Sequence, residues 1–210
     1  MPLRRGAYLA LACLCLAACS NPDSERARRT TVPTYDKKTG RLTELTYDRN
    51  KNGVIDTWTE MDGTRALRSR IDLDEDGKID RWEYYDEKGA LVKVGFSRAK
   101  DGKVDAWAYS GPDGKVSRIE ISSTGDDRKI DREELYENGS MVRAREDTNA
   151  DGRMDKWETY ENGALKTAAM DEDGDGKPDR RLTYDASGAL VLIESEPDAS
   201  GAYATRVVVK

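Results

Sequence analysis

Asp72–Glu83 reads DLDEDGKIDRWE, with a carboxylate at positions 1, 3, 5, 9 and 12 and Gly77 at position 6. A hard cation such as Ca²⁺ prefers six to eight oxygen ligands at about 2.3 to 2.6 Å, and alternate side chains on a tightly turning backbone can supply them. Glycine permits the sharp turn that this convergence needs. The stretch therefore predicts a Ca²⁺ site formed by Asp72, Asp74, Asp76, the backbone carbonyl of Lys78, Asp80 and Glu83.

The same pattern returns along the chain at an almost constant spacing. Alignment on position 1 gives starts at Asp48, Asp72, Ser97, Ser123, Asp147 and Asp171, which are 24, 25, 26, 24 and 24 residues apart. A period in this range is typical of a repeat architecture. All four tryptophans, Trp58, Trp82, Trp107 and Trp157, fall at position 11 of their units. We interpret them as core residues that pack on neighbouring units.

The six loops differ in their ligand sets. The second complete set is Asp147, Asn149, Asp151, the Arg153 carbonyl, Asp155 and Glu158. A third set has Leu182 at position 12 and comprises Asp171, Asp173, Asp175, the Lys177 carbonyl and Asp179. The first loop offers Asp48, Asn50, Asn52 and Asp56, and its two amides lower the charge and the expected affinity. The units at Ser97 and Ser123 lack a carboxylate at position 1 and are expected to be turns only.

Two considerations oppose these assignments. Aspartate and glycine also form ordinary turns without any metal. In a regular strand the side chain at position 12 faces away from that at position 9, which counts against Glu83 and Glu158 as ligands. Three carboxylates within a few ångströms nevertheless repel one another unless a cation lies between them, and this favours Ca²⁺ at the Asp-rich loops.

The segments between the loops have the period of β-strands. Apolar and charged residues alternate in 79–85 and in 154–160, and a glycine turn follows, as in Asn138-Gly139 and Asn162-Gly163. Asn-Gly favours a type I′ hairpin turn. Only about twelve residues separate successive loops, too few for a helix on each side of a turn. We therefore predict an all-β fold, a repetitive antiparallel β-hairpin array (meander or solenoid-like), with the calcium loops between strands.

The N-terminus predicts export and a lipid anchor. Arg4 and Arg5 precede twelve apolar residues, 7–18, a run too short to cross a bilayer and typical of a signal peptide that forms a helix. Leu16-Ala17-Ala18-Cys19 resembles the lipobox of bacterial lipoprotein precursors, which implies cleavage before Cys19 and acylation of that residue; a plain secretory signal is the alternative. The predicted division is a signal peptide at 1–18, a lipidated and disordered tether at 19–33, and a repeat domain of about six units at 34–210.

The composition of the chain disfavours nucleic-acid binding and catalysis. The chain has 41 Asp and Glu against 35 Lys and Arg, and removal of residues 1–18 lowers its formal net charge from −6 to −8. This acidity disfavours nucleic acid as a partner. The absence of histidine and of any nucleophile motif disfavours catalysis, so we do not expect an enzyme. Paired carboxylates that act on glycans are the catalytic alternative, but the repeat already explains the acidic residues.

Over residues 34 to about 201 the chain resembles bacterial lipoproteins with EF-hand-like (DxDxDG) repeats, and the Asp171 loop resembles those of thrombospondin type 3 repeats. The resemblance implies Ca²⁺ binding, membrane attachment through the lipid and a location in the bacterial envelope, at the outer membrane if the cell has one. It leads to the hypothesis of a structural or interaction protein whose Ca²⁺ ions staple successive repeats. The alternative is an adhesion module for an envelope polysaccharide or protein, with calcium incidental.

Overall fold

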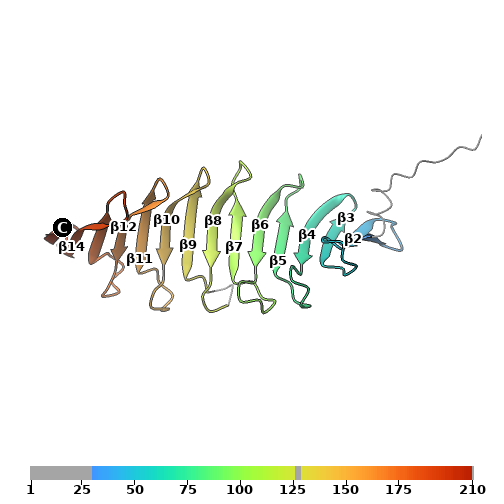
Figure 1. The fold of residues 1–210 in the computed structure, drawn as a ribbon, viewed down its shortest axis with the longest axis horizontal. Coiled ribbons are helices and arrows are strands. Elements are labelled where there is room, and N and C mark those ends of the chain that lie inside the picture. Colours follow the sequence, from blue (N-terminus) through green and yellow to red (C-terminus); the bar gives the residue numbers. More distant parts are fainter. Residues whose placement is uncertain (1–29, 126–128, 210) are drawn as a thin grey trace, which may run out of the picture.

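The computed structural model describes residues 30–125 and 129–209 and forms one antiparallel sheet of 15 strands. The strands lie in sequence order, so every strand pairs with its neighbours in the chain (Figure 1). The first eight are β1 (Thr31–Tyr35), β2 (Leu42–Tyr47), β3 (Thr57–Asp62), β4 (Arg65–Ile71), β5 (Arg81–Tyr85), β6 (Leu91–Phe96), β7 (Ala106–Ser110) and β8 (Val116–Ile121). The others are β9 (Arg132–Glu137), β10 (Ser140–Glu146), β11 (Lys156–Glu161), β12 (Ala164–Met170), β13 (Arg180–Tyr184), β14 (Leu190–Pro197) and β15 (Tyr203–Val208).

The predicted β-hairpin array is confirmed. Short glycine turns join the strands at one of their ends, and the longer Asp-rich loops join them at the other, so turns and loops form two rows along the sheet (Figure 1). Asn138 and Gly139 have φ of 51° and 83°, and Asn162 and Gly163 have φ of 51° and 80°. Positive φ at both central residues is the geometry of the predicted type I′ turn.

The sheet begins before the predicted start of the repeat domain. β1 begins at Thr31, so Thr31–Pro33 belong to the sheet and not to the tether. Pro33 fits there because β1 is an edge strand, where a residue without an N–H is tolerated. The predicted signal peptide, Cys19 and the tether up to residue 29 lie outside the described residues. In the described residues no helix is long and apolar enough to span a membrane.

The tryptophans share one face of the sheet. Trp58, Arg70, Trp82, Gly95 and Trp107 are successive cross-strand partners from β3 to β7. Side chains of directly paired residues point to the same face. The same row continues through Glu120, Glu133 and Arg145 to Trp157.

Trp107 is the buried tryptophan of this row, with 9% of its surface exposed. Its indole lies across Gly95, where an added Cβ would come within 2.7 Å of the ring. The Lys93 ammonium lies 3.6 Å from the ring centroid, and the Tyr84 ring is 5.9 Å away. The predicted packing role is therefore observed at Trp107, where a neighbouring strand supplies the glycine and the lysine that cover it.

The opposite face carries small buried apolar residues beside charged ones. Val94, Ala144 and Ala168 are buried on it, and Glu158 lies between Ala144 and Ala168 in the cross-strand row. The aliphatic stems of long charged side chains cover apolar surface while their charged ends pair with one another. A single-layer sheet can thus bury apolar groups on this face without a second layer above it.

Candidate metal centre

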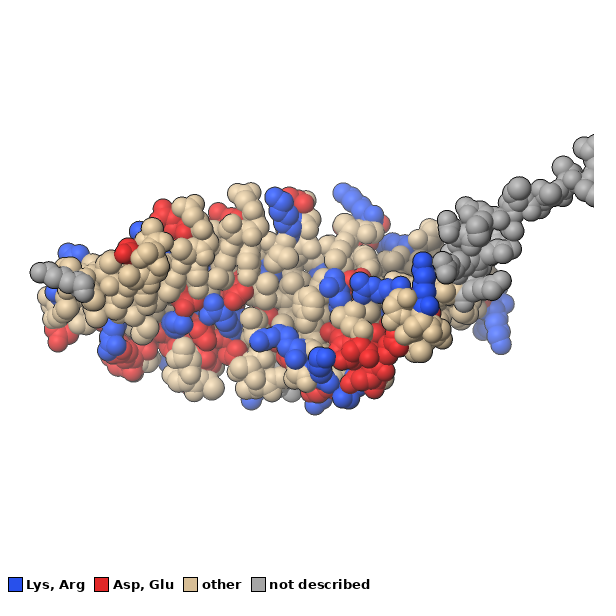
Figure 2. Space-filling model, in the orientation of Figure 1, with Lys and Arg blue, Asp and Glu red and all other residues tan. Residues whose placement is uncertain are grey.

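All the Asp-rich loops share one backbone frame. From the second loop onward, the residue at position 1 donates its N–H to an aspartate carbonyl at the end of the preceding loop, as Asp72 does to Asp56 (2.9 Å) and Ser97 does to Asp80 (2.8 Å). These bonds extend the sheet ladder into the loops. Each loop from the second onward is therefore bonded to the loop before it, and the loops follow one another in a row at the same ends of the strands. Figure 2 shows acidic side chains gathered on this side of the sheet, most densely near the loop between β4 and β5.

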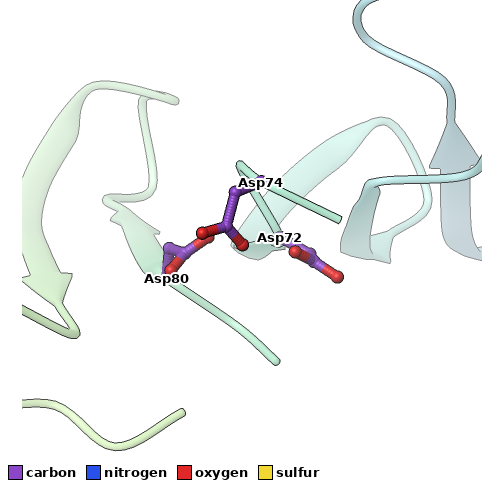
Figure 3. Close-up of side chains that lie close together, drawn as sticks. All are labelled: Asp72, Asp74 and Asp80. Atoms are coloured by element: carbon purple, nitrogen blue, oxygen red, sulfur yellow. The ribbon is translucent and has the colours of Figure 1, made fainter. Parts of the chain in front are cut away.

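The Asp72 loop brings three carboxylates together. Asp72, Asp74 and Asp80 each offer an oxygen within 4.8 Å of the others, and Asp74 lies between the other two (Figure 3). Asp72 Oδ2 accepts from the Gly77 N–H (2.9 Å), and Asp80 Oδ2 accepts from the Leu73 N–H (2.7 Å). These bonds to the loop backbone hold the two carboxylates in place in the loop.

One oxygen of this group has no partner. Asp72 is only 6% exposed, and its Oδ1 is buried without a hydrogen bond. A buried carboxylate oxygen left unpaired costs about 1 to 3 kcal/mol. The donor set consists of hard carboxylate oxygens, which suit a hard divalent cation such as Ca²⁺. A metal ion therefore fits the residues that are present.

The Asp171 loop forms a second group of the same kind. Asp171, Asp173 and Asp179 also offer oxygens within 4.8 Å of one another. Asp171 accepts from the N–H groups of Gly174 and Gly176 at 2.8 and 2.7 Å. These two loops are the only ones in which the described residues bring three such ligand groups within this distance.

The predicted ligands at position 5 also close the loop turns. Asp76, Asp151 and Asp175 each accept from the backbone N–H two residues on, at 2.8 Å. The residues that donate these bonds are Lys78, Arg153 and Lys177, whose carbonyls remain predicted ligands.

The loops at Asp147 and Asp48 have the same scaffold but fewer charges. Asp147 accepts from Gly152 (2.8 Å), and Asp155 accepts from Thr148 (3.0 Å). Position 3 is Asn149, whose amide oxygen accepts from the Asp151 N–H (2.9 Å). In the first loop Asp48 caps Gly53 (2.7 Å) and Asp56 accepts from Arg49 (3.1 Å), with Asn50 and Asn52 between them.

Glu83 and Glu158 lie on the sheet and not with the loop carboxylates. Glu83 accepts from Arg81 (2.7 Å) and from the Tyr85 hydroxyl (2.6 Å). Glu158 pairs with Arg132 (3.1 Å) and Lys156 (2.8 Å). Both carboxylates thus have partners of their own, and neither belongs to a three-aspartate group, as the strand period at position 12 leads one to expect.

The unit assigned to Ser123 starts one residue earlier. Ser122 donates its N–H to the Asp105 carbonyl (2.8 Å), which is the contact of position 1 in the other loops. Ser123 instead donates its N–H to Asp131 (2.6 Å), as position 2 does elsewhere. With this register the six starts are 24, 25, 25, 25 and 24 residues apart, and this loop contains one extra residue. The sequence pattern placed the start of this loop one residue too late because no carboxylate marks its first position.

Sequence reasoning also missed a contact between adjacent loops. Lys100, from the Ser97 loop, donates its ammonium to Asp74 Oδ2 at 2.8 Å. This hydrogen bond lowers the pKa of the exposed Asp74 carboxyl. Glu75 reaches in the same way from its loop to the side-chain amide of Asn50, at 2.5 Å. Lys100 and Glu75 both stand at position 4, a spacing visible in the sequence, but only the structure shows which loop they contact.

The comparisons with known proteins leave the family open. No family model matches the chain, and no curated protein matches it. Among solved structures, a mutant of S. aureus TarM in complex with fondaparinux, alpha-GlcNAc-glycerol and UDP is 12% identical, with a TM-score of 0.36 over 50% of this chain and 22% of that one. A GtfA/B complex is 15% identical, with a TM-score of 0.32 over 60% and 20%.

A porin-like protein from Bacteroides uniformis is 11% identical, with a TM-score of 0.23 over 84% of this chain and 86% of that one. The chain spans about a fifth of the length of the first two structures. At these identities and TM-scores the likeness does not extend to function.

Proposed function

We propose that this chain is a calcium-binding lipoprotein of the bacterial envelope, in which Ca²⁺ at the Asp-rich loops staples successive β-hairpins. The role is structural or interactive, and the proposal includes no catalytic step. The observation that carries it is the buried, unpartnered Oδ1 of Asp72 beside two further aspartates. A cation there would supply the partner that this oxygen lacks and would screen the repulsion among three carboxylates.

The loop frame explains how a bound ion would act as a staple. Asp72 directly follows β4, and Asp80 directly precedes β5. An ion that contacts both carboxylates would hold the ends of the two strands together. Because the backbone of each loop is bonded to the next, the restraint would pass along the edge of the sheet.

Ordinary linkage sets the size of the effect. At tenfold excess over its dissociation constant, Ca²⁺ would add about 1.4 kcal/mol to the stability at each site. The cysteines of the sequence are Cys13, Cys15 and Cys19, so the repeat domain contains no disulfide that could stabilise it in place of Ca²⁺. The envelope location and the anchor at Cys19 rest on the N-terminal sequence alone.

Thermal unfolding tests the proposal. We expect the melting temperature of the protein to rise in millimolar Ca²⁺ and to return to its starting value when EDTA is added. Circular dichroism at the β-sheet band follows the transition. A melting curve that is the same in EDTA and in millimolar Ca²⁺ would rule out the staple.

A further inference from the structure

The Asp72 site already contacts a positive charge, and the charge comes from the neighbouring loop. Lys100 Nζ lies 2.8 Å from Asp74 Oδ2, on the middle carboxylate of the three. Lys78 Nζ donates in turn to the Lys100 carbonyl at 3.3 Å, which ties the two loops together. The Lys100 side chain remains 67% exposed, so it is free to move into solvent.

A side chain at position 4 contacts the preceding loop in two places, and in each its charge suits the groups that it meets. Lys100 and Glu75 both occupy position 4 of their loops, with φ of 55° and 60°. Glu75 accepts from the amides of Asn50 and Asn52 in the loop before it, at 2.5 and 2.7 Å. A carboxylate thus meets the loop with amides, and an ammonium meets the loop with carboxylates.

We propose that Lys100 is an internal competitor for the cation site formed by Asp72, Asp74 and Asp80. Its ammonium neutralises part of the negative charge when the site holds no metal, and a divalent cation must displace it from Asp74 in order to bind. The inference rests on the proposed function, and it adds that the neighbouring loop sets the affinity of this site. The buried Asp72 Oδ1, which Lys100 does not contact, still requires a partner after Lys100 has paired with Asp74.

The Asp171 group provides an internal contrast. Its three carboxylates have the same spacing, but no Lys or Arg of the described residues forms an ion pair with Asp171, Asp173 or Asp179. We therefore expect the Asp171 site to bind Ca²⁺ more tightly than the Asp72 site, although Asp171 is less buried than Asp72.

Calorimetric titration of the full chain with CaCl₂ tests this inference. The reference protein and both lysine variants carry Asp171→Asn so that the second group does not contribute, and the unmutated chain is titrated beside them. Lys100→Met removes the competing ammonium. Lys103→Met removes the same charge from the same loop, at a lysine that forms no ion pair within the part of the chain that the structure describes. Circular dichroism confirms that each variant is folded.

We expect Lys100→Met to tighten Ca²⁺ binding by about threefold to tenfold, and Lys103→Met to change it by less than about twofold. Equal Ca²⁺ affinities in the two variants would overturn the inference and leave the proposed function intact. If all of the proteins, including the unmutated chain, take up no Ca²⁺, the proposed function falls and this inference falls with it.

Discussion

At the scale of single residues, the two carboxylate oxygens of Asp72 have different surroundings. Its Oδ2 caps the loop backbone at Gly77, while its Oδ1 is buried without a partner. The sequence pattern was sufficient to find the residue, because aspartate at position 1 before an Asp-rich turn is common to cation loops. It was not sufficient to find Lys100, whose contact with Asp74 depends on how neighbouring loops align.

Asp72→Asn separates the two uses of this carboxylate. An amide can still accept from Gly77, so we expect little loss of stability in EDTA, since the substitution removes a buried, unpaired charge. In millimolar Ca²⁺ the variant should lack about 1.4 kcal/mol of the stabilisation seen in the unmutated protein, measured by urea unfolding.

Asp113→Asn, in a glycine turn on the opposite edge of the sheet, is the matched control and should keep the full calcium effect. An Asp72→Asn variant that gains as much stability from Ca²⁺ as this control would contradict the assignment of Asp72.

Gly95→Ala tests the packing of Trp107. The new Cβ would stand 2.7 Å from the indole, so the ring must leave its position, and we expect a loss of about 1 to 3 kcal/mol of unfolding free energy. Gly111→Ala is the control, because the nearest atom there is an oxygen of the exposed Asp113 side chain at 3.3 Å, which can move. Near-ultraviolet circular dichroism should change only in Gly95→Ala. Equal stability of the two variants would show that Trp107 does not pack as described.

At the scale of the strand, clusters of charged side chains connect neighbouring strands of the sheet. Arg132 of β9 pairs with Glu146 of β10 (3.1 Å) and with Glu158 of β11 (3.1 Å), so one side chain connects three strands. Burial and the hydrogen bond to Glu134 raise the pKa of Tyr136 to about 12. The period-two pattern predicted which residues share a face, but it could not show that Glu158 pairs with arginine and lysine on the sheet.

Glu158→Gln tests this cluster. Burial opposes ionisation of Glu158, but hydrogen bonds from Lys156 and Tyr160 outweigh it and lower the pKa of the carboxyl below its ordinary 4.5. A group whose folded pKa is depressed adds stability above its unfolded pKa, and the protein loses that stability as the pH falls below about 4.5. We expect Glu158→Gln to cost about 1 to 3 kcal/mol at pH 7 and less near pH 3.

Glu161→Gln is the matched control, because Glu161 is 66% exposed and pairs with Lys166 only at 3.6 Å. Urea unfolding at pH 7 and at pH 3 gives both values. A cost that is the same for the two variants at pH 7, or that does not fall on acidification, would contradict the role given to Glu158.

At the scale of the whole molecule, the chain is a long single-layer sheet with different connections at the two ends of its strands. Tight glycine turns connect the strands at one end, and the Asp-rich loops connect them at the other end and form a row (Figure 1). The repeat period and the Asn-Gly turns were enough to predict this order, because strands joined by short turns pair with their neighbours. The exact register was not predictable at Ser122, where the loop gains a residue and has lost its carboxylate at position 1.

The direct test is a calorimetric titration of the unmutated full chain with Ca²⁺ that counts the sites. We predict saturable binding of at least two ions, at the Asp72 and Asp171 loops, with dissociation constants of about 10⁻⁴ to 10⁻³ M, the range of extracellular calcium modules. A folded protein that takes up no Ca²⁺ at millimolar concentration would contradict the account, and the loops would then be ordinary polar turns.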